Sequence, residues 1–192
     1  MSHFINIHTH TPTSRHIEPQ GVGIHPWQAA VQPFDPTMFQ GAELIGEIGL
    51  DYACYVDRQL QQDVFCKQLV LAKEMALPVV IHCVKAFEDV FKLLLKYNLE
   101  KAVFHGFIGS AEQAKIVVKK GYFLSFGFTA ERSPRTLKAL QKVPLANIFA
   151  ETDTSSRPIE EVYELICRIK GCSLEELASA IEDNYKKLFN KQ

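Results

Sequence analysis

The sequence predicts an α/β fold in which strands and helices alternate around a parallel sheet of the TIM-barrel type. Short apolar, β-branched runs alternate along the chain with longer segments that carry apolar residues at helical spacing. Potential metal ligands follow several of these runs, at the strand ends where α/β barrels keep their chemistry. The chain has 192 residues, whereas a full eight-unit barrel typically needs roughly 250. We therefore predict one domain over residues 1–192, a truncated or distorted barrel with seven strands and C-terminal helices.

The seven predicted strands are short apolar runs bounded by polar residues or turn signals. About ten residues, 11–20, separate the first strand from the second, and a helical crossover normally needs at least that many. We therefore expect no full βαβ unit there. The strands are expected at residues 4–8, 21–25, 43–48, 78–82, 102–104, 122–126 and 147–151.

Helices are predicted where apolar residues recur every three or four positions. In 57–75 this spacing is set by residues such as Leu60, Val64 and Leu69. Ser110 is a plausible N-cap, and Ser173 opens a sequence of capping-box form. The helices are expected at residues 57–75, 86–97, 111–120, 134–141, 160–170 and 173–181.

Charge and cysteine content restrict the partners. Lys and Arg total 21 and Asp and Glu total 22, giving a formal net charge of −1, so no global field attracts nucleic acid or an anionic membrane. The chain has no stretch of the roughly 18 apolar residues that a membrane span needs, and we expect a cytoplasmic protein without a membrane partner. Its five cysteines include no CxxC pair and fit reduced thiols.

The candidate metal ligands are imidazoles and carboxylates. His8 and His10 alternate along an extended strand, so both side chains can face one ion. A single residue of this kind is more often a hydrogen-bonded or solvated side chain, but six at strand ends favour one or two divalent ions, Mg, Mn or Zn. Cys83 is a weaker, soft candidate. The six predicted ligands are His8, His10, Glu47, His82, His105 and Asp153.

Two of these ligands are also predicted to be catalytic. Glu47 lies between apolar neighbours, where a carboxylate needs a cation or a donor, and we expect it to bridge metal ions. Asp153 can act both as a ligand and as the base that accepts a proton from water, although helix capping is an alternative for this acidic segment. His25 also follows a strand, and for it a substrate-binding and a structural function are about equally favoured.

Several segments resemble the TatD family of metal-dependent hydrolases, within the amidohydrolase-like barrels. The resemblance runs from end to end, and its most specific segment is Ile45-Gly46-Glu47-Ile48-Gly49-Leu50-Asp51-Tyr52. The other matching segments are Asn6-Ile7-His8-Thr9-His10, Gly23-Ile24-His25-Pro26, Leu77-Pro78-Val79-Val80-Ile81-His82, His105-Gly106-Phe107-Ile108-Gly109-Ser110 and Glu151-Thr152-Asp153.

The resemblance implies a one- or two-metal centre on the same six residues. It also implies a deoxyribonuclease that degrades DNA from the 3′ end, in which metal-activated water attacks phosphorus.

Three departures from the family bear on the substrate. Val84 stands where the family has an arginine, and Lys85 can replace that arginine only as a point charge. The residues after Asp153 lack the family's Ala-Pro and the long loop that follows it, although Arg157 there can supply a phosphate contact. The missing unit after His10 removes part of the rim. We therefore expect His25, Lys85 and Arg157 to bind substrate.

Three functions are consistent with the sequence. The first is a metal-dependent hydrolase of a phosphodiester, acting on DNA ends. The second is a hydrolase of the same fold acting on a small amide, lactone or phosphate ester, because one fold hosts many reactions. The third is a catalytically degenerate metal-binding protein. An uncovered parallel sheet edge also suggests a homodimer.

Overall fold

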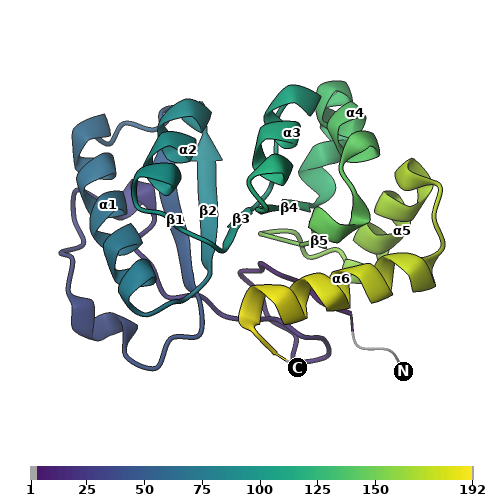
Figure 1. Cartoon of the computed structure of the whole chain (residues 1–192), viewed down its shortest axis with the longest axis horizontal. Coiled ribbons are helices and arrows are strands. Elements are labelled where there is room, and N and C mark those ends of the chain that lie inside the picture. The colour runs from purple at the N-terminus through teal and green to yellow at the C-terminus, as the bar shows by residue number, and fades with distance from the viewer. Residues whose placement is uncertain (1–3, 192) are drawn as a thin grey trace. The chain divides into compact units, whose positions relative to one another are not determined.

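The structure, a computed structural model, describes residues 4–191. The chain divides into two compact units, shown with the element labels in Figure 1. The terminal unit combines Met1–Pro19 with Phe104–Gln192, and the middle unit is Gln20–Val103. The predicted single domain over residues 1–192 stays a prediction.

The middle unit is built on two parallel strands. Strands β1 and β2 pair with Ile48 opposite Ile81 and Gly49 opposite His82. In this register, the residues at the C-terminal end of β1 lie beside those at the C-terminal end of β2, because the two strands run in the same direction. The elements are η1 (Pro26–Gln28), η2 (Pro36–Phe39), β1 (Ile45–Asp51), α1 (Arg58–Glu74), β2 (Val79–Val84) and α2 (Phe87–Lys96).

The terminal unit contains a second parallel pair, β4 and β5, with Ser125 opposite Phe149. The two chain segments of this unit meet beside β5, where the amide of Ile7 donates to the carbonyl of Ala150. A short strand, β3 (Ala102–Phe104), crosses the boundary between the units along the sequence. The other elements are α3 (Ala111–Lys119), β4 (Phe123–Phe126), η3 (Phe128–Arg132), α4 (Pro134–Lys142), η4 (Leu145–Asn147), β5 (Ile148–Ala150), α5 (Ile159–Lys170) and α6 (Leu174–Phe189).

Five of the seven predicted strands form within residues 4–191, and the other two appear only as isolated bridges. At 21–25, Val22 bridges Ile45, but the backbone of Ile24 is satisfied by the side chain of Gln68. At 4–8, Ile5 bridges Ile17, and the hydroxyl of Tyr163 accepts from the amide of Ile5 at 3.1 Å and donates to its carbonyl at 3.0 Å. Side chains thus take hydrogen bonds that a neighbouring strand would otherwise make, and the ladders stop.

All six predicted helices are present, with ends that shift by one or two residues in most cases. Ser110 and Ser173 form the capping boxes that begin α3 and α6. The last helix continues past the residue 181 that periodicity predicts as its end, includes the segment 184–189 that resembles the closing helix of the TatD family, and ends at Asn190 in the left-handed conformation. The sequence from 181 to 189 contains no Gly or Pro that would interrupt it.

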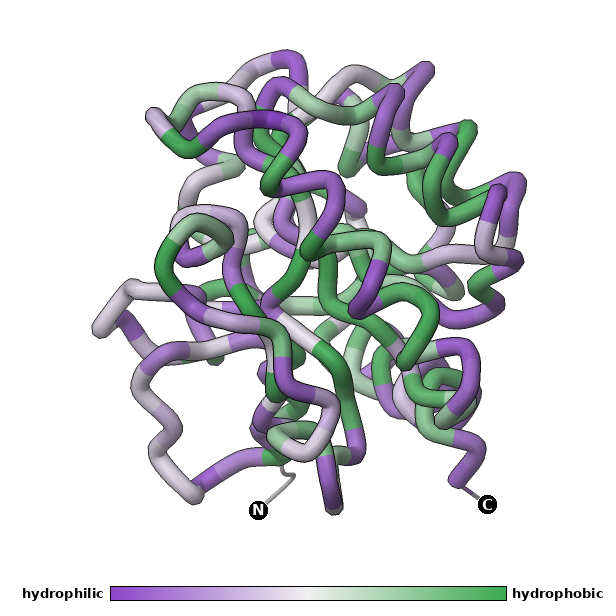
Figure 2. The backbone as a smooth tube through the Cα atoms, turned by 90° about the vertical axis from the view of Figure 1, so that its left-hand side faces the viewer, coloured by the Kyte–Doolittle hydropathy of each residue, from purple (hydrophilic) through white to green (hydrophobic). Residues whose placement is uncertain are grey.

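Hydrophobic and hydrophilic residues alternate along the helices in Figure 2, as expected for helices that bury one face. Strands β3, β4 and β5 are buried along their whole length. Among the helices described, none is long and apolar enough to cross a membrane.

Candidate metal centre

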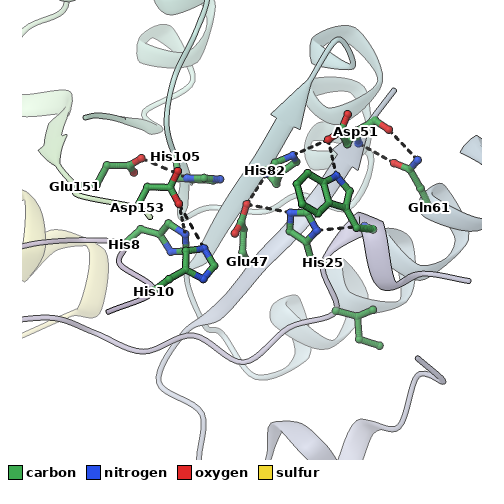
Figure 3. A network of polar contacts seen from close by, with 12 residues as sticks. His8, His10, His25, Glu47, Asp51, Gln61, His82, His105, Glu151 and Asp153 are labelled. Carbon is green, nitrogen blue, oxygen red and sulfur yellow. Dashed lines mark hydrogen bonds and ion pairs between the residues drawn. The ribbon is translucent and has the colours of Figure 1, made fainter. Parts of the chain in front are cut away.

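The terminal unit brings together three of the predicted ligands. The backbone after Ile7 continues beside the chain that follows β5, with the amide of His10 donating to the carbonyl of Asp153 and the amide of Asp153 donating to that of His8. This pairing turns the three side chains toward one another (Figure 3). The Oδ1 atom of Asp153 lies 3.4 Å from Nε2 of His10 and 3.9 Å from Nε2 of His8.

A buried polar network supports this group. The amide side chain of Asn6 donates to Oγ1 of Thr152 at 2.9 Å and accepts from the backbone amide of Thr152 at 3.0 Å. The hydroxyls of Thr152 and Thr9 are 3.0 Å apart. Because Thr9 directly follows His8 and Thr152 directly precedes Asp153, the network fixes the backbone from which these candidate ligands project.

Asp153 has a backbone φ of +53°, in the left-handed region. Asp and Asn enter this region more readily than other residues with a Cβ atom. The conformation directs the carboxylate toward the histidines, and it limits which substitutions the position accepts.

His105 and Glu151 extend the group. The ring of His105 lies 4.5 Å from that of His8, and its Nδ1 is 3.4 Å from Oε1 of Glu151. The hydroxyl of Ser125 forms a short hydrogen bond to the same carboxylate. Burial raises the pKa of Glu151, but attraction to His105 and His8 and the hydrogen bonds from His105 and Ser125 outweigh it, so this pKa lies below its usual value.

The middle unit holds a second group around Glu47. Its Oε1 atom lies 2.5 Å from Nδ1 of His82 and 3.3 Å from Nε2 of His25 (Figure 3). Glu47 comes from within β1 and His82 from β2, and the register of these strands places them side by side. Opposite them, the ring of His25 packs edge-on against His82 at 4.4 Å.

Asp51 supports His82 from the other side of the imidazole. One carboxylate oxygen lies 3.3 Å from Nε2 of His82 and accepts from the indole of Trp27 at 2.7 Å. The other accepts from the amide of Ala53, and the side chain of Gln61 bonds both backbone groups of Asp51. Burial raises the pKa of Asp51, but these side-chain and backbone donors hold it below its usual range.

Gly49 lies between Glu47 and Asp51 in β1, opposite His82 in the parallel pair. Its φ is +146°, and a Cβ atom at this position would lie 3.0 Å from the backbone nitrogen of His82 and 2.9 Å from its carbonyl carbon. Only glycine therefore allows β1 and β2 to approach here.

The donor atoms of both groups fit divalent cations. In each group, one ligand atom per residue lies within 4.8 Å of the others, as for His8, His10 and Asp153. Imidazole and carboxylate are ligands that Zn and Mn accept, and carboxylates also suit Mg. Burial raises the pKa of the Cys83 thiol to about 12, which disfavours its thiolate.

The six predicted ligands are divided between the units. His8, His10, His105 and Asp153 lie in the terminal unit, and Glu47 and His82 in the middle unit. Each set is brought together within its own unit.

The predicted substrate-binding residues differ in their surroundings. His25 contacts Glu47, and Lys85 is exposed at the end of β2 with a φ of +51°. Arg157 is already engaged: its guanidinium lies 2.7 Å from Oε2 of Glu161 and 3.2 Å from Oε2 of Glu131. A phosphate at Arg157 would therefore compete with two carboxylates.

A cavity of about 220 Å³ lies in the terminal unit next to the His8 group. Asn6 and Thr152, which support that group, also line the cavity. It is also lined by Arg15, Arg157 and Ser156 and by the carboxylates of Glu18 and Glu160, so the cavity presents groups of both charges and a hydroxyl.

Sequence reasoning assigned no function to Asp51 or Glu151. Both have a signal in the alternation of strands, because residues two or four apart share a face. Asp51 is four residues after Glu47, and Glu151 is two residues before Asp153. This spacing predicts that both carboxylates lie on the same face of their strands as the candidate ligands.

The family model described as "TatD related DNase" matches residues 16–190. The chain belongs to the TatD family. It is 34% identical over 163 residues to the uncharacterized metal-dependent hydrolase YabD of Bacillus subtilis, covering 76% of this chain and 64% of that protein. It is 32% identical over 163 residues to deoxyribonuclease TATDN3 of Homo sapiens, covering 77% of this chain and 60% of that protein. The chain thus spans less than two thirds of the length of these TatD relatives.

The crystal structure of the TatD homologue YjjV from Escherichia coli is similar, with a TM-score of 0.82 and 28% sequence identity. The similarity covers 90% of this chain and 77% of that one. It shows that the chain has the α/β fold of TatD structures. A closed barrel with seven strands stays a prediction.

Proposed function

We propose that this TatD-family chain is a metal-dependent hydrolase that cleaves phosphodiester bonds at DNA ends. The observation that carries the proposal is the group of His8, His10 and Asp153, whose ligand atoms converge from two distant parts of the sequence. The name of the human relative, a deoxyribonuclease, supports the choice of bond.

The candidate residues divide into ligands and supports. His8, His10, His105 and Asp153 would hold one divalent ion, and Glu47 and His82 would contribute to a second. A bound ion supplies charge neutralisation at the reacting phosphate and lowers the pKa of water. Asp153, whose carboxylate is about one third exposed, can accept the proton that the attacking water releases.

Substrate would be held beside this group by cationic residues. The cavity lined by Arg15 and Arg157 lies next to Thr152, which directly precedes Asp153. Arg157 offers a forked pair of donors for a phosphate, but Glu131 and Glu161 must first release it. Lys85 is exposed and offers a point charge.

A second candidate function is hydrolysis of a small amide, lactone or phosphate ester. Two observations favour it: Val84 occupies the position of the family's arginine, and the formal net charge is −1. A valine at this position and a slightly negative net charge do not give the extended positive surface that long nucleic acids need. A degenerate protein that binds metal without turnover is the third candidate.

Trimming of 3′-labelled single-stranded DNA with Mg or Mn tests the first proposal. We expect activity in the wild type, its loss in Asp153→Asn, and its retention in Asp183→Asn, which alters an exposed carboxylate on α6. Asn also tolerates the left-handed conformation, so the first variant should fold.

If a metal-loaded wild type leaves DNA intact but cleaves small esters or amides, the second candidate replaces the first. Metal binding without any turnover supports the third.

Salt dependence of DNA binding separates the candidates further. Binding through several phosphates weakens steeply as salt rises, with a slope of about 0.7 per phosphate for single strands. We expect a measurable slope for the wild type that becomes smaller in Arg157→Gln. An affinity that does not change with salt contradicts a substrate held through its phosphates.

A further inference from the structure

The turn between α5 and α6 brings two cysteines together. Helix α5 ends at Gly171, whose φ of +68° reverses the chain. The amide of Cys172 then donates back to the carbonyl of Cys167 at 3.3 Å, across five residues. In helix ends of this Schellman type, the side chains at these two positions contact each other, and the contact is usually hydrophobic. Here both positions are occupied by thiols.

The backbone geometry suits a covalent link. A backbone hydrogen bond joins the two residues directly, and their two thiols are close enough to hydrogen-bond each other. Disulfides span α-carbon separations of about 4.4–6.8 Å. The sulfur of Cys167 is also directed toward the turn, because it lies 3.5 Å from the carbonyl oxygen of Ser173, the residue directly after Cys172.

The surroundings leave both thiols within reach of small reagents. Cys167 and Cys172 are each partly exposed. Burial, followed by the neighbouring Cys172 thiol, raises the pKa of Cys167 to about 11, which is consistent with two sulfurs in mutual contact. The raised pKa makes Cys167 a weak nucleophile at neutral pH.

We propose that Cys167 and Cys172 are a dithiol modification site, which a low-molecular-weight disulfide such as oxidised glutathione converts into an intramolecular disulfide. The thiolate of Cys172 attacks one sulfur of oxidised glutathione, and the first glutathione leaves as a thiolate that takes up the proton lost by Cys172. Cys167 then loses its proton and attacks the sulfur of Cys172, and the second glutathione leaves as a thiol. Two cysteine thiols are oxidised, and one glutathione disulfide is reduced to two thiols.

The turn can accept this link without moving its helices. Lys170 anchors the end of α5 by donating to the carbonyls of Gln141 at 2.8 Å and Val143 at 2.6 Å. Ser173 begins α6 through its capping box with Glu176. Cys172 lies between these two fixed points and Cys167 lies three residues before Lys170 on α5, so the disulfide closes a small ring at a helix end that is held on both sides.

The other three cysteines differ from this pair. Cys54, Cys66 and Cys83 lie in the middle unit, outside the α5–α6 turn. The pKa of Cys83 is raised to about 12 by burial, which makes it slow to react. These cysteines provide internal controls for the site.

The test is incubation of the folded, reduced protein with oxidised glutathione, followed by intact-mass measurement and peptide mapping. We expect the wild type to lose two hydrogen atoms without retaining glutathione, and the map to link residues 167 and 172. Cys167→Ser should instead retain one glutathione on Cys172, because the second thiol is missing. Cys54→Ser should behave as the wild type does.

The rate should also rise with pH, since both steps need thiolates. Wild-type protein that accumulates stable glutathione adducts, or a map without the 167–172 link, overturns the proposal. The map of the wild type decides even if a variant fails to fold.

Discussion

At the scale of single residues, buried carboxylates lie beside the candidate ligands and contact their imidazole rings. Asp51 is only 4% exposed, and its polar groups are satisfied by hydrogen bonds with Trp27, Ala53 and Gln61. By accepting from Nε2 of His82, it fixes the ring so that Nδ1 is the nitrogen that faces Glu47. Asp51 therefore orients a candidate ligand.

Replacing Asp51 by Asn should weaken metal binding by about 10–100-fold, the usual effect of removing such a partner of a ligating histidine. The reason is that an amide is a weaker acceptor for the imidazole N–H. Titration calorimetry with Mn or Zn measures the change, and Asp63→Asn on the exposed side of α1 is the matched control. Equal affinities in both variants would show that Asp51 does not orient His82.

Glu151 should make the metal-free protein sensitive to acid. Its pKa in the folded state lies below the ordinary value of 4.5. The stabilisation it provides is therefore fully present above about pH 4.5 and is lost as the pH falls through the lowered folded-state pKa. In urea unfolding between pH 7 and pH 3, Glu151→Gln should flatten this part of the curve.

Glu182→Gln, which alters an exposed carboxylate on α6, should leave the same part of the curve unchanged. A Glu151→Gln curve parallel to that of the wild type would contradict the assignment.

At the scale of elements, side chains replace two of the predicted strands. Gln68 on α1 is 1% exposed and accepts from the amide of Ile24 at 2.6 Å while donating to its carbonyl at 3.1 Å. The residues are 44 positions apart in the sequence. One side chain thus connects the 21–25 segment to a helix in the middle unit.

Gln68→Leu should lower the free energy of unfolding by about 2–4 kcal/mol, because two buried backbone groups lose their partners. Gln59→Leu on the same helix is the matched control, since Gln59 is exposed and bonds only to Asp63 among the contacts found for its side chain. Urea denaturation measures both. Similar midpoints for the two variants would mean that Ile24 finds other partners.

Local periodicity was sufficient to predict the helices and the five regular strands. It failed at 4–8 and 21–25 because the side chains of Tyr163 and Gln68, which are distant in the sequence, bond the backbone of Ile5 and Ile24. The candidate ligands were predicted from their residue types at strand ends. Asp51 and Glu151 were overlooked because a carboxylate that supports a histidine is recognised by its contact, and that contact depends on strand pairing.

At the scale of the whole molecule, cation binding at the two candidate groups would link stability to metal. A cation that binds only the folded state stabilises it by about 2.7 kcal/mol at a free concentration 100 times its dissociation constant. We expect a chelator to lower the urea midpoint of the wild type and excess Mn or Zn to restore it. Asp153→Asn should show a smaller response, because only the group around Glu47 stays intact.

A urea midpoint that changes with neither chelator nor added metal would contradict cation binding at either group. Asp183→Asn is the control: because Asp183 is exposed on α6, we expect this variant to have the same urea midpoint as the wild type.

The terminal unit is assembled from both ends of the chain, and this affects the order of events during synthesis. Thr9 and Thr152, whose hydroxyls meet beneath the His8 group, are 143 residues apart. At about 5–20 residues per second, the ribosome releases His8 and His10 on the order of ten seconds before Asp153. A nascent chain can therefore hold a cation with all three residues only after translation has passed Asp153, so occupancy of this group would report that this point has been reached.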